Sequence, residues 1–518
     1  MRENEEISNI TLYEMLEQSV SKWSKNEAIS YKGEIWTYTQ LKNQVDSFAA
    51  GLQKAGIKKG ERIALILSNC PQYVVAYFGI LAIGGVVVQI NPMFTKREIQ
   101  YIISDCAAET IIASDSLTPI IKSIQAETTI KNIISVSIKP SASSDLVKHS
   151  YESIIKAGSS LFEPVMLNPK EDLAVIQYTG GTTGRSKGVM LTHRNLVANI
   201  EQHNMILKET MIPGVEKVLT VIPLFHVYGM TICMNLGILQ GSCLILLPKF
   251  HLEEVLNTIK WEKPTRFAGV PTMYTALNNH PEAEKFGLNS IKLCHSGSSP
   301  LPGEVMDEFE RRTGAEISES YGLSEAAPGV LCTPSYIKRK NGSVGIPLPY
   351  TEAKILDLAT GLYEADIGVV GELVIRGPQI MKGYWNMPKE TEASLKDGWL
   401  YTGDIAKKDG DGFYYIVDRK KDLIIASGYN VYPREVEEVL YEHPSILEAV
   451  VVGIKDDYRG ETVKAVIVLK EGKYLTKDEL TIHCQKYLSP YKVPKVVDIR
   501  ETLPKTSVGK ILRRTLKE

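Results

Sequence analysis

The residues best suited to chemistry lie in one stretch, from Tyr178 to His193, which is rich in glycines, hydroxyls and cations. Glycines let a ligand approach the backbone closely, and exposed amides, hydroxyls and positive charges suit a polyphosphate. The stretch therefore predicts a phosphate-binding loop. Its candidate binding residues are Thr179, Gly180, Gly181, Thr182, Thr183, Gly184, Arg185, Ser186 and Lys187.

Two other interpretations of this stretch remain open. It does not have the spacing of the common nucleotide phosphate loop, which needs Gly, four residues and then Gly-Lys-Ser/Thr, so a flexible solvent loop is one alternative. The run from Gly184 to Gly188 also matches the nucleophile elbow of serine hydrolases. An elbow needs a strand that leads almost directly into the serine, whereas Thr179 to Thr183 intervene here. Dependence of turnover on ATP would separate a hydrolase from a nucleotide-binding enzyme.

The stretch resembles the phosphate-binding loop of the adenylate-forming superfamily, which includes acyl-CoA synthetases, peptide-synthetase adenylation domains and luciferases. Further motifs follow in the family's order over nearly the whole chain. The resemblance implies that a carboxylic acid attacks the α-phosphate of ATP, giving an acyl-adenylate and pyrophosphate, and that the thiol of CoA then takes the acyl group. ATP, Mg²⁺ and CoA are the cofactors it implies.

A second motif, Ser318 to Glu325, belongs to the nucleotide site in this resemblance. Tyr321 would lie against the adenine, Ser324 would reach the α-phosphate, and Glu325 would hold Mg²⁺, a cation that prefers oxygen ligands. The family usually has Thr at the position of Ser324, and the hydroxyl is retained. The candidate catalytic residues are Ser324 and Glu325 of this motif, Lys187 of the phosphate-binding stretch, and Lys510 near the C-terminus.

Further nucleotide contacts are implied at three places. Gly297 and Ser298 resemble the segment whose backbone lines the adenine pocket, although a simple turn has a similar sequence. Asp404 would accept from the ribose diol, because a carboxylate offers two acceptor oxygens; a turn cap is the alternative. Arg419 would add a polar contact to the nucleotide.

The C-terminal region carries the family's mobile parts. Lys510 would bridge the substrate carboxylate and the α-phosphate and stabilise the charge that develops there, although a basic C-terminus is more often a solvated tail. Gly428 and Tyr429 match the loop that rotates into the site for the second half-reaction, with Gly428 leaving room for pantetheine. Lys421 stands at the family's hinge position.

The acyl pocket is indicated more weakly. His226, Val227 and Gly229 match the stretch that flanks the substrate carboxylate, where amino-acid-activating relatives usually carry an Asp. Because this chain has His226 there and no acid nearby, the stretch favours a plain carboxylic acid over an amino acid as the substrate. A lone His between apolar residues is, however, as often structural. We expect a medium- or long-chain fatty acid, with aryl acids as the alternative. Candidate lining residues are Ala268, Val270, Met273 and Ser320.

The elements that must position these residues follow an α/β pattern. At 518 residues the chain exceeds a single core, and alternating helices and apolar strands predict mainly parallel sheets. We expect an AMP-binding body over residues 1–417, with a β-rich subdomain at about 340–417, a hinge at 418–422 and a small mobile α+β domain over 423–518. Strands are expected to begin near Arg62, Val86, Thr110, Ile130, Leu173, Lys217, Ser242, Arg266 and Ile291.

Bulk properties limit the function further. The net charge of -2 gives no basic field for nucleic acid. Seven scattered cysteines without a Cys-x-x-Cys pair favour free thiols in a reducing compartment. The longest apolar run, Tyr73 to Val88, is interrupted by glycines and is shorter than the ~20 residues of a membrane helix. We therefore expect a cytoplasmic enzyme, with peripheral membrane contact left open and no indication of its oligomeric state.

Two alternatives concern the reaction as a whole. A separate acyl carrier protein offers the same thiol as CoA, and the sequence does not exclude an acyl-AMP ligase that loads one. A non-catalytic sensor of nucleotides or acyl-CoA is the other class. Such a sensor could lose Lys510 without penalty, so the presence of Lys510 together with Glu325 and Asp404 disfavours it.

Overall fold

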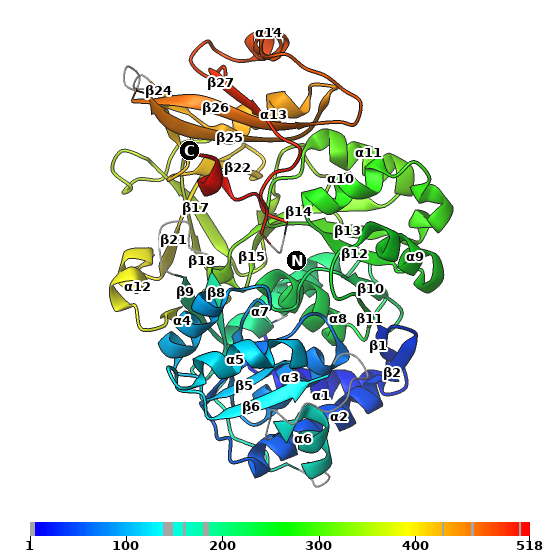
Figure 1. The fold of residues 1–518 in the computed structure, drawn as a ribbon. Helices are drawn as coiled ribbons and strands as arrows, with labels where there is room; N and C mark the ends of the chain where they lie inside the picture. The colour runs from blue at the N-terminus through cyan, green and yellow to red at the C-terminus, as the bar shows by residue number, and fades with distance from the viewer. Residues whose placement is uncertain are drawn as a thin grey trace.

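The computed structural model describes residues 6–137, 149–158, 162–179, 186–426, 429–456, 460–506 and 509–517. The chain folds into a large α/β body and a smaller C-terminal domain that rests on one end of it (Figure 1). The fold class expected from the alternating pattern is confirmed.

One sheet of the body is built from the N-terminal third of the chain and carries the phosphate-loop hairpin. From β8 to β7 its neighbours are parallel, while β8–β9 and β9–β19 are antiparallel. In spatial order its strands are β19 (Gly383–Tyr384), β9 (Lys187–Thr192), β8 (Leu173–Thr179), β4 (Val86–Gln89), β3 (Arg62–Ile66), β5 (Thr110–Ser114), β6 (Asn132–Val136) and β7 (His149–Ser150).

A second sheet carries the adenine and acyl motifs. It is parallel from β14 to β1 and ends in antiparallel strands on both sides. In spatial order its strands are β16 (Ile346–Pro347), β15 (Gly329–Cys332), β14 (Glu316–Gly322), β13 (Leu293–Ser296), β12 (Arg266–Gly269), β10 (Lys217–Thr220), β11 (Cys243–Leu246), β1 (Glu27–Tyr31) and β2 (Glu34–Thr37).

Helices connect and cover these sheets, as α/β crossovers require. The apolar run from Tyr73 forms α3 and then turns at Gly84, whose φ of +72° suits glycine, into β4. The helices are α1 (Leu12–Trp23), α2 (Tyr38–Lys54), α3 (Pro71–Ala82), α4 (Lys96–Cys106), α5 (Thr118–Gln125), α6 (Tyr151–Ala157), α7 (His193–Leu207), α8 (Leu236–Leu239), α9 (Leu252–Glu262), α10 (Pro271–Asn279) and α11 (Gly303–Thr313). Short helices are η1 (Asp115–Leu117), the π-helix η2 (Gly229–Asn235), η3 (Ala283–Phe286), η4 (Leu288–Ser290) and η5 (Ser324–Ala326).

The stretch from Tyr178 to His193 differs from its prediction as one continuous loop. Residues 187–192 form β9, which pairs antiparallel with β8, so the second part of the stretch is a strand. Buried Val189 and Leu191 explain the strand, because their alternation places them on the core side. The next helix begins at His193, the last residue of the stretch, with Thr192 as its N-cap.

The β-rich subdomain forms an antiparallel sheet beside the body. Its strands are β17 (Glu352–Leu356), β18 (Gly371–Arg376), β21 (Trp399–Lys408), β20 (Leu395–Lys396) and β22 (Tyr414–Arg419), and α12 (Pro388–Ser394) lies beside them. Asp418 and Arg419, which were expected to begin the hinge, are the last two residues of β22. Their pairing with β21 holds them in regular structure, so the irregular connection begins at Lys420.

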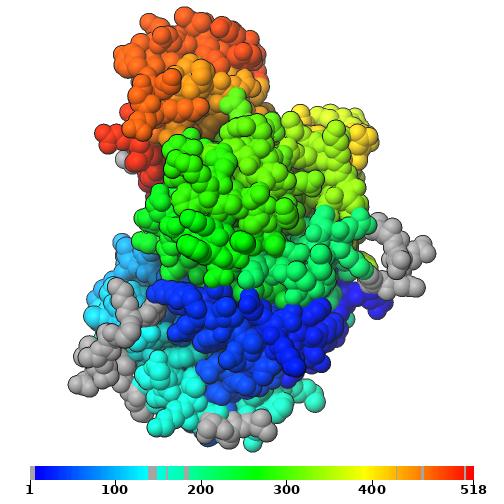
Figure 2. All heavy atoms as spheres, turned by 90° about the vertical axis from the view of Figure 1, so that its right-hand side faces the viewer, coloured from blue at the N-terminus to red at the C-terminus, as the bar shows by residue number. Residues whose placement is uncertain are grey.

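The C-terminal domain has its own apolar cores, in which each buried residue comes from position 424 or later. It rests on the middle part of the chain (Figure 2). Its elements are β23 (Ile424–Ala426), β24 (Tyr429–Val431), α13 (Pro433–Tyr441), β25 (Ile446–Asp456), β26 (Gly460–Leu469), α14 (Lys477–Tyr487), β27 (Val496–Ile499) and η6 (Arg513–Leu516).

Candidate active site

Three of the phosphate-loop candidates, Thr179, Ser186 and Lys187, lie where β8 and β9 meet. Thr179 ends β8 and pairs with Lys187, the first residue of β9. The Ser186 hydroxyl donates to the carbonyl of Thr179, and the hydroxyl of Tyr101 donates to the carbonyl of Ser186 at 3.0 Å. The engaged hydroxyl gives no support to a serine nucleophile. The other candidates, Gly180, Gly181, Thr182, Thr183, Gly184 and Arg185, lie outside the described residues.

Tyr321, Asp404 and Arg419 meet at the contact between the second sheet and the β-rich subdomain. The phenol of Tyr321 donates to Oδ2 of Asp404 at 2.5 Å, and Nε of Arg419 lies 3.1 Å from Oδ1. The Asp404 carboxylate is nearly buried, whereas Arg419 remains 38% exposed. Among the described residues, each oxygen of Asp404 therefore has one side-chain partner and retains acceptor capacity, since a carboxylate oxygen has about two acceptor sites.

A second group links Glu325, Tyr384 and Lys187. The hydroxyl of Tyr384 donates to Oε1 of Glu325 at 2.8 Å, and Nζ of Lys187 lies 4.7 Å from the centre of the Tyr384 ring. Tyr384 belongs to β19, which pairs with β9. One aromatic side chain thus fixes both the candidate magnesium ligand and the candidate phosphate lysine. Ser324 precedes Glu325 as the first residue of η5.

The segment after β13 approaches the same region. Gly297 lies against the ring of Tyr228, since a Cβ at Gly297 would fall 3.5 Å from that ring. Ser298 has a φ of +68°, a left-handed conformation that is uncommon for a residue other than glycine. Leu301 donates its backbone N–H to Oε1 of buried Glu319 at 3.2 Å. This segment therefore forms an unusual turn that is partly exposed at Ser298 and held at Leu301 by buried Glu319.

Lys510 reaches the body from the end of the C-terminal domain. Its neighbour Gly509 has a φ of +75° and lies so close to the body that a Cβ would approach Oγ1 of Thr272 to 2.8 Å and Cγ2 of Val270 to 2.9 Å. In Figure 1 the red C-terminal segment descends from its domain toward β14 and β15. The final segment is therefore docked beside the strand end that carries the acyl candidates.

The electrostatics of Lys510 place it among the nucleotide candidates. Burial, with the nearby cations Arg419 and Lys421, lowers the pKa of Lys510 to about 8, while Asp404 opposes the shift. Its charge also acts on His226, whose pKa burial lowers to about 4. Lys510 therefore lies near both Asp404 and His226, which come from separate parts of the chain.

His226 is held as a neutral donor. The buried side chains of Gln89 and Gln177 donate to the carbonyls of Leu224 and Phe225, at 3.0 and 3.2 Å, and so fix the segment before His226. The N–H of Tyr228 donates to Nδ1 of His226 at 3.2 Å. Since Nδ1 accepts, the proton of the neutral ring belongs on Nε2, which can donate to a carboxylate oxygen.

The comparisons with known proteins agree with this geometry. Residues 16–385 match the family model described as AMP-binding enzyme, and residues 435–510 match the AMP-binding enzyme C-terminal domain. The chain belongs to the AMP-binding enzyme family.

Similar proteins match over nearly the full length. A long-chain-fatty-acid–CoA ligase of Bacillus subtilis (strain 168) is 45% identical over 99% of this chain and 95% of its own. A feruloyl-CoA synthase of an Amycolatopsis species is 34% identical over 94% of each chain. The crystal structure of ATP-bound MatB from Rhodopseudomonas palustris has a TM-score of 0.89 at 29% identity, covering 98% of both chains, whereas the apo structure of MatB has 0.79. The arrangement here is thus more similar to the ATP-bound form.

The remaining acyl candidates line one region of this AMP-binding fold. Val227 and Val270 are almost fully buried, and Gly229 begins the π-helix η2. Gly229 is required there, because a Cβ would lie 2.3 Å from the carbonyl oxygen of Pro223. Ala268 is buried on β12 and Met273 on α10. The hydroxyl of Ser320 on β14 lies 3.3 Å from Sγ of Cys332.

The candidates for the second half-reaction lie elsewhere in this arrangement. Tyr429 is 58% exposed and stacks on Tyr491 of its own domain, with ring centres 4.8 Å apart. Gly428 lies outside the described residues. Lys421 is close enough to Arg419 and Asp404 for both to act on its pKa, which burial lowers. The hinge candidate thus lies next to the nucleotide candidates, whereas Tyr429 does not join them.

Sequence reasoning missed Tyr384 and the contact between Asp418 and Arg434, although Asp418 was expected in the hinge. Asp418 accepts from the backbone N–H of Arg434 in the first turn of α13 at 3.0 Å, and the Arg434 guanidinium donates to the carbonyl of Ile416 at 2.6 Å. These bonds join β22 of the body to the C-terminal domain. Local sequence does not predict these contacts, because each one joins residues from different elements that belong to no recognised motif.

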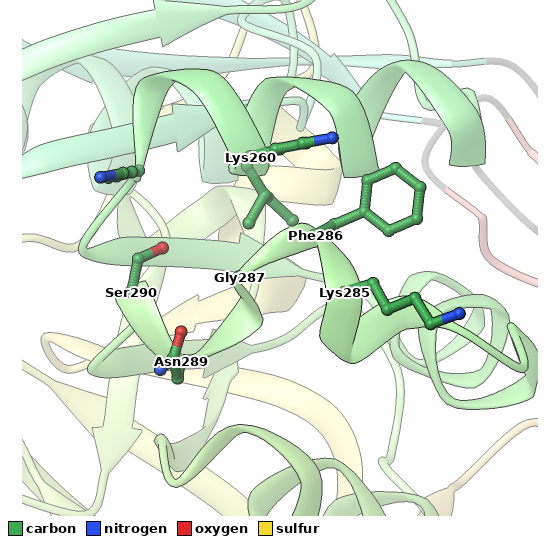
Figure 3. A pocket seen from close by; sticks show the side chains of 8 residues that line it. Lys260, Lys285, Phe286, Gly287, Asn289 and Ser290 are labelled. Atoms are coloured by element: carbon green, nitrogen blue, oxygen red, sulfur yellow. The ribbon is translucent and has the colours of Figure 1, made fainter.

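Two surface pockets lie away from these residues. One, of about 280 Å³, is lined by Lys260, Lys285, Phe286 and their neighbours on α9, η3 and η4 (Figure 3). The other, of about 240 Å³, lies between α10–α11 and the C-terminal domain. Neither contains a predicted site residue, so neither changes the assignment of the site.

Several other expectations concern the whole molecule. All seven cysteines are free and buried, as expected. Among the described helices, none has both the length and the apolar character that a membrane crossing needs. Within the described residues, no group of three or more His, Cys, Asp or Glu side chains forms a metal site.

Proposed function

We propose that this enzyme activates a long-chain fatty acid with ATP and transfers the acyl group to CoA, and that the residues named above carry out the reaction. The observation that supports this most strongly is the docking of Gly509 and Lys510 beside Val270, among Asp404, Arg419 and His226. It brings a cation from the C-terminal domain to the point where the acid and the nucleotide would meet.

The choice of acid rests on similarity. The Bacillus subtilis relative at 45% identity is named for long-chain fatty acids, whereas the feruloyl-CoA synthase is less similar at 34%. The apolar candidates Val227, Ala268 and Val270 suit an alkyl chain, since burial of each methylene contributes about 0.8 kcal/mol. A fatty acid is therefore favoured over an aryl acid.

In the first step a carboxylate oxygen of the acid attacks the α-phosphorus of ATP. The bond from that phosphorus to the bridging oxygen breaks, and pyrophosphate leaves with the electron pair. Lys510 would lie between the two anions and offset their repulsion, while Nε2 of His226 donates to the substrate carboxylate. Lys187 and the phosphate loop would bind the leaving pyrophosphate.

The residues present fit a magnesium ion that arrives with ATP. Mg²⁺ usually binds through one or two carboxylates together with substrate phosphates. Glu325 offers such a carboxylate: Tyr384 donates to one oxygen, and no described residue donates to the other. When bound, the ion would neutralise phosphate charge. Tyr321 would stack on the adenine, while Asp404 accepts from the ribose hydroxyls.

In the second step the sulfur of CoA attacks the carbonyl carbon of the mixed anhydride, the thiol proton is lost and AMP leaves. Tyr429 lies outside the site in this arrangement, so we infer a rotation of the C-terminal domain about Lys421 that brings its loop inward. We favour free CoA over a carrier protein because the similar proteins are named as CoA ligases. We also place the enzyme in the cytoplasm.

The decisive experiment measures pyrophosphate release with ATP, Mg²⁺ and a panel of fatty and aryl acids, with and without CoA. Wild-type enzyme should release pyrophosphate with long-chain fatty acids, and CoA should stimulate turnover. Lys510→Ala should lose pyrophosphate release while still transferring the acyl group from supplied acyl-adenylate to CoA. Absence of release with every acid would refute the proposal, and stimulation by a carrier protein but not CoA would correct the acceptor.

A further inference from the structure

Arg266 lies on the same face of the second sheet as the acyl candidates. Alternate residues of a strand share a face, so Arg266 and Ala268 of β12 point the same way. The register places His295 of β13 beside Ala268, and Ser318 of β14 beside His295. Phe267 points to the opposite face, where its ring packs against Tyr274 of α10. The acyl face therefore continues from Ala268 down to Arg266.

The helices on that face lie near the Arg266 side chain. Nη1 donates to Oε1 of Gln240, at the end of α8, over 2.8 Å. The charge of Arg266 acts on Cys233 of η2 and on His203 of α7, and it lowers the pKa of His295 together with burial. The guanidinium thus lies in the layer between the sheet and these helices, which is also the layer next to Val227 and Gly229.

This buried cation lacks the partners that its burial requires. Arg266 is 3% exposed, and no described residue accepts a hydrogen bond from its Nε. Within the described residues, no carboxylate lies within 4 Å of its guanidinium. Glu216 is the carboxylate that acts on it, but the oxygens of Glu216 accept from Ile212 and Thr265.

The imidazole of His295 is a second buried polar group of this kind on the same face. His295 is 3% exposed, and its Nε2 likewise has no hydrogen-bond partner in the part of the chain that the structure describes. An unpaired buried charge or polar group is costly, and such groups are few in native proteins. The arrangement is explained if a bound molecule supplies an acceptor oxygen.

We propose that Arg266 and His295 form a polar distal end of the acyl pocket and select a fatty acid that carries a second oxygen function, a carboxylate or hydroxyl, far from the carboxylate that is activated. This rests on the proposed function. Arg266 is four residues before Val270, so the two lie roughly 13 Å apart in extended backbone. The pocket should therefore favour a particular spacing between the two oxygen functions.

The test compares three acid series of matched length: unsubstituted fatty acids, ω-hydroxy acids and α,ω-dicarboxylic acids. Wild-type enzyme should prefer one oxygenated series, with kcat/KM about 10- to 100-fold above the unsubstituted acid of the same length, the range for hydrogen bonds to a charged group. The preferred series identifies the group as carboxylate or hydroxyl. Arg266→Met should remove the preference and raise activity on the unsubstituted acid.

Controls separate specificity from folding. Arg312→Met also removes an arginine with a mostly buried side chain, but this residue of α11 pairs with Glu284 of η3, so its removal should leave the preference unchanged. Thermal unfolding of each variant checks the fold. Equal use of the three series by wild type, unchanged in Arg266→Met, would overturn this inference while leaving the proposed function intact. Absence of activity with every acid would instead refute the proposed function.

Discussion

Tyr321 and Asp404 are 83 residues apart in the chain, yet the phenol of Tyr321 donates to the Asp404 carboxylate at 2.5 Å. The bond joins β14, which carries the proposed adenine contact, to β21, which carries the proposed ribose contact. Arg419 holds the other oxygen of Asp404. The two nucleotide contacts are therefore positioned as one unit before a ligand arrives.

Removal of this hydroxyl should weaken ATP use while leaving the ring in place. We expect Tyr321→Phe to lower kcat/KM for ATP by about tenfold, because a hydrogen bond to a charged group contributes about 1.5–3 kcal/mol. Asp404→Ala should lower it further, since the ribose contact is lost as well. Tyr441→Phe, which loses a hydroxyl bond to Ala449 within the C-terminal domain, is the control. Equal losses in both tyrosine variants would contradict the prediction.

The pKa of Lys510 predicts how adenylation depends on pH. Burial lowers this pKa from 10.5 to about 8, so Lys510 is charged below pH 8 and loses its proton above it. If the charge stabilises the transition state, kcat/KM for pyrophosphate release should fall as pH rises through about 8. Lys510→Arg should shift this fall to higher pH, because arginine stays protonated. A profile that is the same in both enzymes would show that another group titrates.

The fold was predictable where local pattern decides structure. Strands β3, β4 and β8 begin at the residues where apolar runs predicted them, Arg62, Val86 and Leu173. The error at β9 has a physical reason: Lys187 to Thr192 becomes a strand only because β8 and β19 pair with it on both sides. Because polar and glycine residues lie near the start of β9, the sequence alone does not predict this pairing.

Motifs predicted residues of the candidate site, but they did not predict which other residues hold them in place. Asp404, Arg419 and Lys510 were expected to serve the same nucleotide, and the structure brings them together. Tyr384 was missed because its role depends on β19 pairing with β9, nearly 200 residues away in the chain by their sequence numbers. Contacts of this kind are set by tertiary packing and leave no local periodicity.

Gly509 should be required for the docked position of Lys510. In Gly509→Ala the new Cβ would crowd Thr272 and Val270, and the φ of +75° would strain the backbone. We expect pyrophosphate release to fall at least about tenfold, whereas CoA transfer from supplied acyl-adenylate should change little. Gly472→Ala introduces similar strain at a φ of +68° with no atom within 4 Å, so it controls for strain alone. Unchanged release in Gly509→Ala would contradict this docking.

Tyr384 should affect the Mg²⁺ concentration that pyrophosphate release requires. Tyr384→Phe removes the donor to Glu325 but keeps the ring beside Lys187. We expect the Mg²⁺ concentration for half-maximal pyrophosphate release to rise several-fold, with kcat at saturating Mg²⁺ largely retained, because the carboxylate is less well oriented. Tyr414→Phe, which loses a hydroxyl bond to the carbonyl of Ala353, is the matched control. An unchanged Mg²⁺ dependence would show that Glu325 does not need this bond.

Asp418 should stabilise the arrangement that performs adenylation. Its carboxylate lies on the body but accepts from the N–H of Arg434, one of the first-turn donors of α13 that have no partner within the helix. Loss of such a cap costs about 1 kcal/mol, or roughly a fivefold change in an equilibrium. Because this cap crosses from β22 to the C-terminal domain, Asp418→Ala should shift the balance toward undocked arrangements.

We therefore expect Asp418→Ala to slow pyrophosphate release several-fold relative to CoA transfer from supplied acyl-adenylate. Thr476→Ala is the matched control, because Thr476 caps α14 entirely within the C-terminal domain. It should lower the stability of that domain without changing the ratio of the two half-reactions. If both variants changed the ratio equally, domain stability rather than the contact between Asp418 and Arg434 would set the balance.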